Sequence, residues 1–432
     1  MKYPRTCFLF AASRALGLPL AALSAAPFLL SAASPVIYNF QGGSTDGANP
    51  KRPVVFNSSG QMFATTVYGG STGNGIVFEL TPSGGSWSES SIYNFLGGTD
   101  GAEPDGALVL NGGVFYGTTS IGGSATGSGS GTVFDLSSSA GSWTEKVLYR
   151  FHGSSGASPY AGLALNGSVY YGTTYNGGAT AHGVVFSMTH GAGGWTEAVV
   201  YPFAGPPNDG ANPHAPVTIV SATLMYGTTY NGGNSALCSG GCGTVFKLQQ
   251  TGGVWTETAL YNFGATSTDG KNPHGQVVVD SNGVIYGTTL TGGTHGAGTV
   301  FSLTPSPGNS WTYAVIHEFT GGANDGAEPR AGLIIAPTTG VLYGTTTEGG
   351  GSKLCTGGCG TVYSMTLSSG VWTESVLYKF LGGTGSGADG AQPYADLVLS
   401  KGYLYGETYA GGTSTACAAN DGCGTVFALK VP

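Results

Sequence analysis

Residues 284–319 read VIYGTTLTGGTHGAGTVFSLTPSPGNSWTYAVIHEF, and the pattern in this stretch organises the rest of the chain. Two β-like runs, around Tyr286 and Phe301, are joined by a glycine-rich loop, and a third run opens at Trp311 after a Pro-Gly-Asn-Ser turn. The same landmarks recur along almost the whole chain, which indicates a repeat architecture. Six tryptophans, 52 to 61 residues apart, mark successive copies: Trp87, Trp143, Trp195, Trp255, Trp311 and Trp372.

Each copy contains four short runs with alternating apolar and aromatic positions, which are typical of β-strands. In the sixth copy we expect these strands at 332–336, 341–346, 360–365 and 371–380. An Asn-Gly, Ser-Gly or Thr-Gly turn separates the first two strands in most copies. Four antiparallel strands repeated seven times predict an all-β fold, a seven-bladed β-propeller with four-stranded blades. A β-helix would need a much shorter period.

The two ends of the repeat array complement each other. The last copy stops after its third strand, at 424–431, and has no tryptophan strand. Residues 35–40, PVIYNF, match the latter half of a fourth strand. We therefore expect the N-terminal strand to complete the seventh blade and close a propeller domain of residues 34–432, which removes exposed sheet edges.

The composition agrees with a folded all-β protein. The chain has 432 residues, of which 79 are glycine and 8% are charged, and its formal net charge is −8. Apolar residues make up 40% and lie in short regular runs, so the glycines are expected in turns rather than in a disordered segment. No basic stripe is present to neutralise phosphates, which argues against a nucleic-acid partner.

Residues 1–33 have the pattern of an export signal. Lys2 and Arg5 give a positive start, an apolar run follows over 15–32, and Ser-Ala-Ala precedes Ser34 as a small-residue cleavage site. An uncleaved membrane anchor is the alternative, because the run approaches the length of a membrane span. Two prolines and several small residues in the run favour a cleaved signal. We therefore expect a secreted or periplasmic protein with no membrane association after cleavage.

The repeat resembles a known family through its motifs YGTT, Gly-Gly, GTVF and WTE. Their order and spacing over residues 35–432 are similar to the GloVer-type tandem repeat of exported bacterial proteins. They are more loosely similar to kelch repeats, which share a Gly-Gly after the second strand and a downstream tryptophan. The resemblance implies an extracytoplasmic location. It implies little about activity, because kelch-like propellers include both enzymes and binding modules.

Six cysteines remain after the signal, as three close pairs: Cys238/Cys242, Cys355/Cys359 and Cys417/Cys423. Each pair precedes a Gly-Thr-Val-(Phe/Tyr) run, and an even count in an exported protein predicts three local disulfides. A zinc site is the alternative, because the CxxxC spacing of two pairs resembles half of such a site. No histidine or second cysteine pair lies close in the same loop, so disulfides are favoured.

The links between copies carry Asp-Gly-Ala-X-Pro or a close variant. The aspartate position holds Asp46, Asp100, Asp209, Asp269, Asp325 and Asp389, and the third link has Ser155 instead. Asp-Gly is a favoured turn, and the proline fixes the entry into the next strand. The functional alternative is a ring of carboxylates near the channel mouth that holds calcium. No single loop supplies the several oxygen ligands that calcium requires, so the turn interpretation is favoured and no cofactor is required.

The residue after that proline varies from copy to copy, whereas scaffold positions repeat one residue type. In order it is Lys51, Asp105, Tyr160, His214, His274, Arg330 and Tyr394. If the propeller closes, Tyr160, His214, His274, Arg330 and Tyr394 form a contiguous arc at the channel, and we predict them as catalytic candidates. Lys51 and Asp105 are predicted to bind ligand. The alternative is that exposed loop-edge positions simply vary. The other histidines, including His317, occupy scattered repeat positions and are expected to have structural roles only.

The leading functional hypothesis is a monomeric extracellular binding module for a glycan or other cell-surface ligand. The sequence has no GxSxG elbow, no HExxH and no P-loop. Tyr175 and Tyr230 each precede Asn-Gly-Gly in a loop, and aromatic rings with a polar tip suit sugar faces.

The alternative hypothesis is a polysaccharide-active enzyme, a lyase or a hydrolase, with its site at the channel mouth. In a lyase, Arg330 would bind a uronate carboxylate, His214 or His274 would be the base, and Tyr160 or Tyr394 would protonate the leaving oxygen. The negative net charge opposes this hypothesis, because an acidic protein repels a polyanion.

Overall fold

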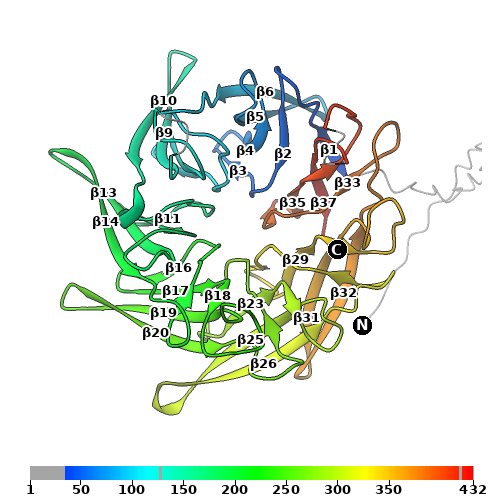
Figure 1. Ribbon diagram of the computed structural model, residues 1–432. Coiled ribbons are helices and arrows are strands. Elements are labelled where there is room, and N and C mark those ends of the chain that lie inside the picture. Colours follow the sequence, from blue (N-terminus) through cyan, green and yellow to red (C-terminus); the bar gives the residue numbers. More distant parts are fainter. Residues whose placement is uncertain (1–34, 126–128, 418–420, 432) are drawn as a thin grey trace, which may run out of the picture. The chain divides into compact units, whose positions relative to one another are not determined.

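A computed structural model describes residues 35–125, 129–417 and 421–431. From Pro35 onward the chain forms seven antiparallel sheets of four main strands each, and Figure 1 shows these sheets in a ring. The predicted all-β, seven-bladed propeller is therefore confirmed. The predicted export signal, residues 1–33, lies outside the described residues.

The strands of each blade are labelled A to D in chain order. Strands A are β3 (Val55–Phe56), β7 (Val109–Asn111), β11 (Ala164–Asn166), β16 (Thr218–Ser221), β22 (Val278–Val279), β28 (Ile334–Ile335) and β34 (Val398–Ser400). Strands B are β4 (Met62–Gly69), β8 (Val114–Thr119), β12 (Val169–Thr174), β17 (Leu224–Thr229), β23 (Ile285–Thr289), β29 (Leu342–Thr346) and β35 (Tyr403–Thr408).

Strands C and D are longer than strands A in most blades. Strands C are β5 (Ile76–Ser83), β9 (Thr132–Ser139), β13 (Val184–Gly191), β19 (Thr244–Thr251), β25 (Thr299–Ser306), β31 (Thr361–Ser368) and β37 (Thr425–Lys430). Strands D are β6 (Ser86–Asn94), β10 (Ser142–Arg150), β14 (Gly194–Pro202), β20 (Val254–Asn262), β26 (Ser310–Glu318), β32 (Val371–Lys379) and, in the seventh blade, β1 (Val36–Asn39).

The segment between strand D of one blade and strand A of the next is called the D–A link, and the loop between strands B and C is called the B–C loop. Short two-stranded ladders, which the sequence did not predict, pair the D–A link that enters a blade with the B–C loop of that blade. In blades 4 to 7 they pair β15 (Gly210–Ala211) with β18 (Asn231–Gly232), β21 (Gly270–Lys271) with β24 (Thr291–Gly292), β27 (Gly326–Ala327) with β30 (Glu348–Gly349), and β33 (Gly390–Ala391) with β36 (Ala410–Gly411). In blade 1, β2 (Gly47–Pro50) pairs directly with β4. Two 3-10 turns, at Gly153–Ser155 and Pro307–Asn309, complete the described elements.

Strand A is shorter than expected because its first residues approach the neighbouring blade. In the sixth blade the prediction of 332–336 becomes Ile334–Ile335. A Cβ on Gly332 would lie 2.5 Å from the carbonyl oxygen of Gln276 in blade 5, so only glycine allows this contact. The Gly332 N–H donates to Asp396 Oδ1 at 2.5 Å instead of joining the sheet ladder.

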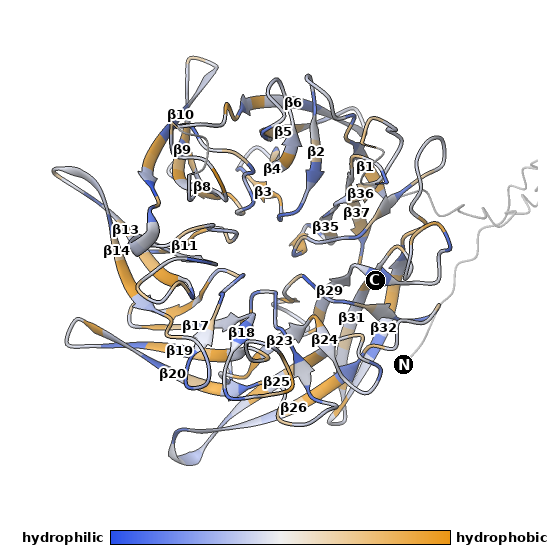
Figure 2. Ribbon diagram, in the orientation of Figure 1, coloured by the Kyte–Doolittle hydropathy of each residue, from blue (hydrophilic) through white to orange (hydrophobic). Residues whose placement is uncertain are grey.

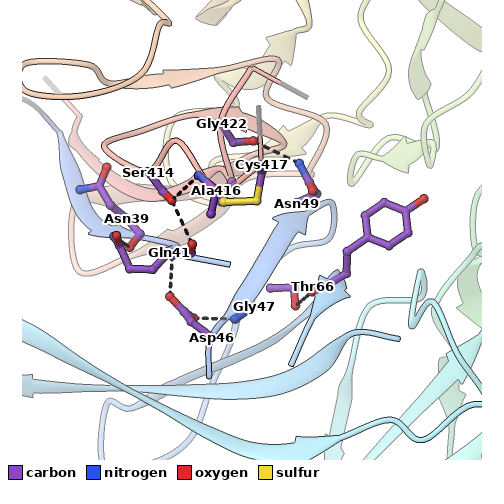
Figure 3. Close-up of a disulfide and its surroundings, with 12 residues drawn as sticks. Asn39, Gln41, Asp46, Gly47, Asn49, Thr66, Ser414, Ala416, Cys417 and Gly422 are labelled. Carbon is purple, nitrogen blue, oxygen red and sulfur yellow. Dashed lines mark hydrogen bonds between the residues drawn. A yellow bond between two sulfur atoms is a disulfide. The ribbon is translucent and has the colours of Figure 1, made fainter. Parts of the chain in front are cut away.

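The ring closes through the N-terminal strand, as expected. Strand β1 pairs antiparallel with β37, with Tyr38 opposite Val426 and Asn39 opposite Thr425. Figure 3 shows the same junction beyond the strands, where Ser414 Oγ donates to the Gln41 carbonyl at 2.9 Å. Segments from the two ends of the domain are thus hydrogen-bonded side by side.

The core consists of repeated aromatic contacts between adjacent blades. A phenylalanine that follows strand D packs edge-on against the strand C aromatic of the next blade, with ring centroids 4.9–5.2 Å apart at all seven junctions. The closing pair, Phe40 and Phe78, is fully buried. Figure 2 shows the hydrophobic colouring on the strands of the sheets. Edge-to-face packing adds to the burial of apolar area, so every junction is stabilised in the same way.

The three predicted disulfides are present: Cys238–Cys242, Cys355–Cys359 and Cys417–Cys423. Each lies in a B–C loop and contacts the D–A link that leaves the same blade. At the third, a Cβ on Gly42 would lie 2.8 Å from both sulfur atoms. The disulfides therefore hold loops against links at the face that carries the candidate site.

The residue after each link proline is fixed by the backbone around it. Gly243, at the start of strand C, has a φ of 95°, and a Cβ there would lie 2.6 Å from Cδ of Pro273 in the next blade. Asn272, just before that proline, has a φ of 57° and donates its Nδ2–H to the Tyr230 carbonyl at 3.0 Å. These contacts hold the link rigid immediately before His274.

Candidate functional site

A cavity of about 550 Å³ lies where the seven links converge. Its lining comprises Lys51, Arg52, Glu103, Asp105, Tyr160, Tyr175, His214, Tyr230, His274, Arg330, Tyr394 and Tyr409. All seven residues singled out from the sequence are in this set, one from each blade. The structure therefore brings them together, while their catalytic or binding roles stay predictions.

Five of these residues contact one another in order across blades 3 to 7. The Tyr160 and His214 rings stack with centroids 5.1 Å apart and an interplanar angle of 16°, and the His214 and His274 centroids are 3.8 Å apart. The Arg330 guanidinium then lies over the Tyr394 ring, 5.1 Å from its centroid. The arc expected from the repeat positions is continuous in space.

Both histidines of the arc are held neutral. Burial, together with the nearby cations Arg52, Arg330 and Lys51, lowers the pKa of His274 to about 3. Burial, the neighbouring His274 and the same cations place the pKa of His214 well below its usual value. Neutral imidazoles can accept a proton or donate a hydrogen bond without carrying charge.

Hydrogen bonding distinguishes the two rings. His274 Nδ1–H donates to the Arg330 carbonyl at 2.8 Å, so the lone pair of its neutral ring is on Nε2. His214 Nδ1 is buried and has no hydrogen-bond partner among the described residues. A buried nitrogen without a partner is costly unless a ligand or water satisfies it.

Arg330 is oriented by its own loop and keeps donor capacity. Its Nη2 donates to Glu328 Oε2 at 2.9 Å, while its Nε lacks a hydrogen-bond partner within the described part of the chain. Burial raises the pKa of Tyr394, with Arg330 acting in the opposite direction. Tyr394 is therefore a protonated phenol beside a fixed cation at neutral pH.

A second charged group lies across the cavity at blades 1 and 2. Lys51 Nζ is 3.6 Å from Asp105 Oδ2 and Arg52 Nη2 is 3.5 Å from Asp105 Oδ1. The Lys51 ammonium also lies 5.4 Å from the centroid of the Tyr409 ring. Asp105 contacts both cations, and Glu103 of the same blade also interacts with Lys51.

The charge of the cavity differs in sign from that of the protein. Its lining has three basic and two acidic side chains, although the formal net charge of the chain is −8. Burial and the neighbouring Asp105 raise the pKa of Glu103, with Lys51 acting against them. Low-dielectric walls strengthen such a local field.

The aspartates of the Asp-Gly links do not line the cavity. They lie against strand D, where for example Asp209 accepts hydrogen bonds from the Tyr201 hydroxyl at 3.0 Å and from the Gly210 N–H at 2.7 Å. These bonds match the turn interpretation. The alternative placed these aspartates in a ring at the channel mouth, and that placement was wrong. Calcium binding by the aspartates at their observed positions stays a prediction.

Five lining residues were not among the seven candidates after the link proline, although Tyr175 and Tyr230 had been noted as loop aromatics that suit sugars. Tyr175, Tyr230 and Tyr409 all follow the Thr-Thr or Glu-Thr pair at the end of strand B, a position that holds other residue types in the remaining blades. The variability argument that found His214 applies equally there and would have identified them. Arg52 and Glu103 flank the chosen positions in blades 1 and 2. Arg52 is a further departure, because the other copies have alanine or glycine at its place.

Within the described ranges, no helix is long and apolar enough to cross a membrane.

Comparison with known proteins identifies the repeat. The family model described as the Gloeobacter/Verrucomicrobia repeat matches residues 28–239, 128–357 and 237–432. No curated protein gives a significant match to the chain. The family match does not bear on the looser kelch resemblance, which stays a prediction.

Solved structures share the fold at low sequence identity. A GH74 enzyme of Niastella koreensis is 15% identical with a TM-score of 0.51, over 86% of this chain and 52% of that one. The present chain thus spans about half the length of that enzyme. A polysaccharide lyase, a PL25 ulvan lyase bound to -[GlcA(1-4)Rha3S]-, is 8% identical with a TM-score of 0.55, over 91% of this chain and 96% of that one. Identities this low establish the propeller alone.

Proposed function

The chain belongs to the Gloeobacter/Verrucomicrobia repeat family, and because that family name carries no activity, we propose a function from the cavity: the protein is an exported module that binds acidic glycans at the propeller mouth. The observation that carries this proposal is the lining itself. Five tyrosines and two neutral histidines surround three basic side chains, in a protein whose net charge is negative. Three disulfides support a secreted or periplasmic location.

The lining suits a sugar that carries a carboxylate. Aromatic rings pack on the apolar faces of sugars and offer hydroxyl groups at their edges. Arginine binds carboxylates through two parallel N–H donors, and Arg330 has an Nε without a hydrogen-bond partner in the described structure. The propeller likeness to a lyase whose bound ligand includes GlcA is compatible with such a ligand.

A binding screen with acidic and neutral oligosaccharides tests the proposal. We expect wild-type protein to bind uronate-containing oligosaccharides, and Arg330→Gln to weaken binding about 10- to 150-fold, which corresponds to the loss of a charged hydrogen bond of about 1.5–3 kcal/mol. Lys146→Gln removes an exposed cation far from the cavity and is the matched control. Failure of every acidic glycan to bind, or equal affinities of wild type and Arg330→Gln, would sink the proposal.

A second candidate, a lyase acting on uronate polysaccharides, is favoured by the His274–Arg330 contact. The Nδ1–H bond to the Arg330 carbonyl leaves the His274 Nε2 lone pair available as a base. In this candidate Nε2 removes the proton next to the uronate carboxylate, a carbon–carbon double bond forms, and the glycosidic bond breaks as Tyr394 protonates the leaving oxygen. Arg330 stabilises the charge that develops on the carboxylate.

The low pKa of His274 makes it a weak base in the free protein. An anionic ligand would offset the nearby cations and raise that pKa, so catalysis would require the bound carboxylate. Incubation with acidic polysaccharides should then increase ultraviolet absorbance, because elimination leaves an unsaturated uronate, whereas hydrolysis gives new reducing ends without this signal. Activity that survives His274→Ala and Arg330→Ala would place the chemistry elsewhere, and no activity over a broad panel leaves the binding function.

A further inference from the structure

The junction between blades 5 and 6 departs from the repeat at two positions: strand C has Tyr363 where the other blades have phenylalanine, and strand D has a histidine, His317. Strand D of the other six blades carries a tyrosine there: Tyr38, Tyr93, Tyr149, Tyr201, Tyr261 and Tyr378. In five of these the hydroxyl donates to the aspartate of the following link at 2.7–3.0 Å. In blade 5 the residue is His317, which places a ring nitrogen where the other blades have a phenol oxygen.

Three potential metal ligands meet at this junction. His317 comes from β26, Asp325 from the link that follows it, and Glu374 from β32 of the next blade. One ligand atom from each lies within 4.8 Å of the others. Their side chains are partly exposed, with 20% of His317 and 13% of Asp325 accessible, so an ion in solution can reach them.

We propose that His317, Asp325 and Glu374 bind a divalent transition-metal ion of the zinc class. Imidazole nitrogen and carboxylate oxygen both bind such ions, and three protein ligands leave the fourth position open to water. Calcium and magnesium prefer an all-oxygen shell, so the nitrogen selects against them. The site is separate from the cavity and does not depend on the proposed glycan function.

The spacing of the histidine and aspartate ligand atoms already fits this coordination. His317 Nε2 lies 3.3 Å from Asp325 Oδ1, which is long for a charged hydrogen bond. Two ligands at tetrahedral zinc, each with a bond near 2.1 Å, are separated by about 3.4 Å. The nitrogen and the oxygen are therefore already spaced as two corners of a tetrahedron.

The surroundings hold the carboxylates in place. Asp325 Oδ2 accepts hydrogen bonds from the Thr320 N–H at 2.8 Å and the Thr320 hydroxyl at 2.9 Å, which orients the carboxylate as an outer shell does in metal sites. Glu374 Oε1 is buried without a hydrogen-bond partner in the described part of the chain. The equivalent glutamates of four other blades share that property, so it is His317, together with the buried and unpartnered hydroxyl of Tyr363, that distinguishes this junction among the described residues.

Metal titration of the full chain, purified without a polyhistidine tag and treated with a chelator, tests the site. Cobalt(II) is the probe, because nitrogen and oxygen ligands around it give visible absorption bands, and zinc(II) then competes for the same site. We expect one equivalent to bind. His317→Tyr restores the residue of the other blades, should fold normally, and should lower the affinity at least about 100-fold. Glu374→Gln should also weaken binding.

The thermal midpoint gives a second readout. Zinc(II) should raise the midpoint of wild type, because the ion links blades 5 and 6 in the folded state only, and it should leave His317→Tyr unchanged. Less than half an equivalent bound to wild type would overturn the proposal. Equal affinity in His317→Tyr would also overturn it, because the ion would then be bound elsewhere on the chain.

Discussion

Replacing Phe40 by alanine is expected to loosen the ring at its closure. Phe40 follows the N-terminal strand β1, is fully buried, and packs edge-on against Phe78 of blade 1 with centroids 5.0 Å apart. Truncating a buried phenylalanine costs about 3–5 kcal/mol. The same loss is expected for Phe263→Ala, whose ring has the equivalent place between blades 4 and 5 and is equally buried.

The two variants should differ in where the structure opens. Strand β1 has three paired residues with β37, whereas β20 has eight with β19, so the closing strand is the weaker pairing. Detaching β1 from β37 also exposes the Phe40 ring to water, and this exposure is part of the free-energy cost of local opening. Phe40→Ala removes that part of the cost. Local opening should therefore become roughly 150- to 5,000-fold more frequent, the factor that corresponds to about 3–5 kcal/mol. Phe263→Ala leaves the opening of β1 unchanged.

Hydrogen-exchange mass spectrometry of peptides covering 35–42 and 424–431 measures this opening directly. Both peptides should exchange much faster in Phe40→Ala than in Phe263→Ala, while urea unfolding shows similar global losses for the two variants. Equal exchange at 35–42 in the two variants would refute the argument that β1 closes the ring. A global loss below about 1 kcal/mol for Phe40→Ala would do the same, because a buried core ring cannot be that neutral.

The remaining predictions concern the loops and the rim. Replacing Cys417 and Cys423 together by serine should lower the free energy of unfolding by about 2 kcal/mol in the chain-entropy model, measured by urea denaturation, and no loss would contradict the role given to that loop. Tyr93→His creates the three-ligand set beside Asp100 and Glu145, so cobalt(II) stoichiometry should rise from one to two, and a value of one would mean that histidine alone does not decide the site. Burial and the Asp100 charge raise the pKa of Glu145 to about 8, above its unfolded value of about 4.3. Its stabilising contribution is therefore present at acid pH and is lost as pH rises toward 8, so Glu145→Gln should show a smaller fall in thermal midpoint between pH 5 and 9 than wild type.

The blade count, the closing strand and the disulfides could be predicted because each rests on landmarks that recur in the chain. The seven cavity residues could be found for the opposite reason. His214 and Arg330 occupy one repeat position that varies while its neighbours do not, and variation within a fixed scaffold indicates contact with something outside it.

The remaining cavity residues and the His317 site depend on how segments of different blades come together. This arrangement cannot be read from any one copy of the repeat. The residue before the link proline has a left-handed backbone in every copy, with φ of 52–58°, yet only Glu103 among these seven residues lines the cavity. Arg52 lies in the cavity beside Asp105 of blade 2, with its Nη2 3.5 Å from Asp105 Oδ1, a contact between two copies of the repeat. His317 was expected to have only a structural role, because its partner Glu374 lies 57 positions further along the sequence, in the next blade.

The most direct test of the central claim, that the cavity recognises the carboxylate of an acidic glycan through Arg330, is a double comparison by calorimetry. A uronate oligosaccharide and its carboxyl-reduced counterpart are titrated into wild type and Arg330→Gln. Carboxyl reduction should weaken binding to wild type about 10- to 150-fold and should change binding to Arg330→Gln by less than about threefold, because the partner of the carboxylate is already gone. An equal loss in both proteins would show that Arg330 does not bind the carboxylate, and would contradict the account.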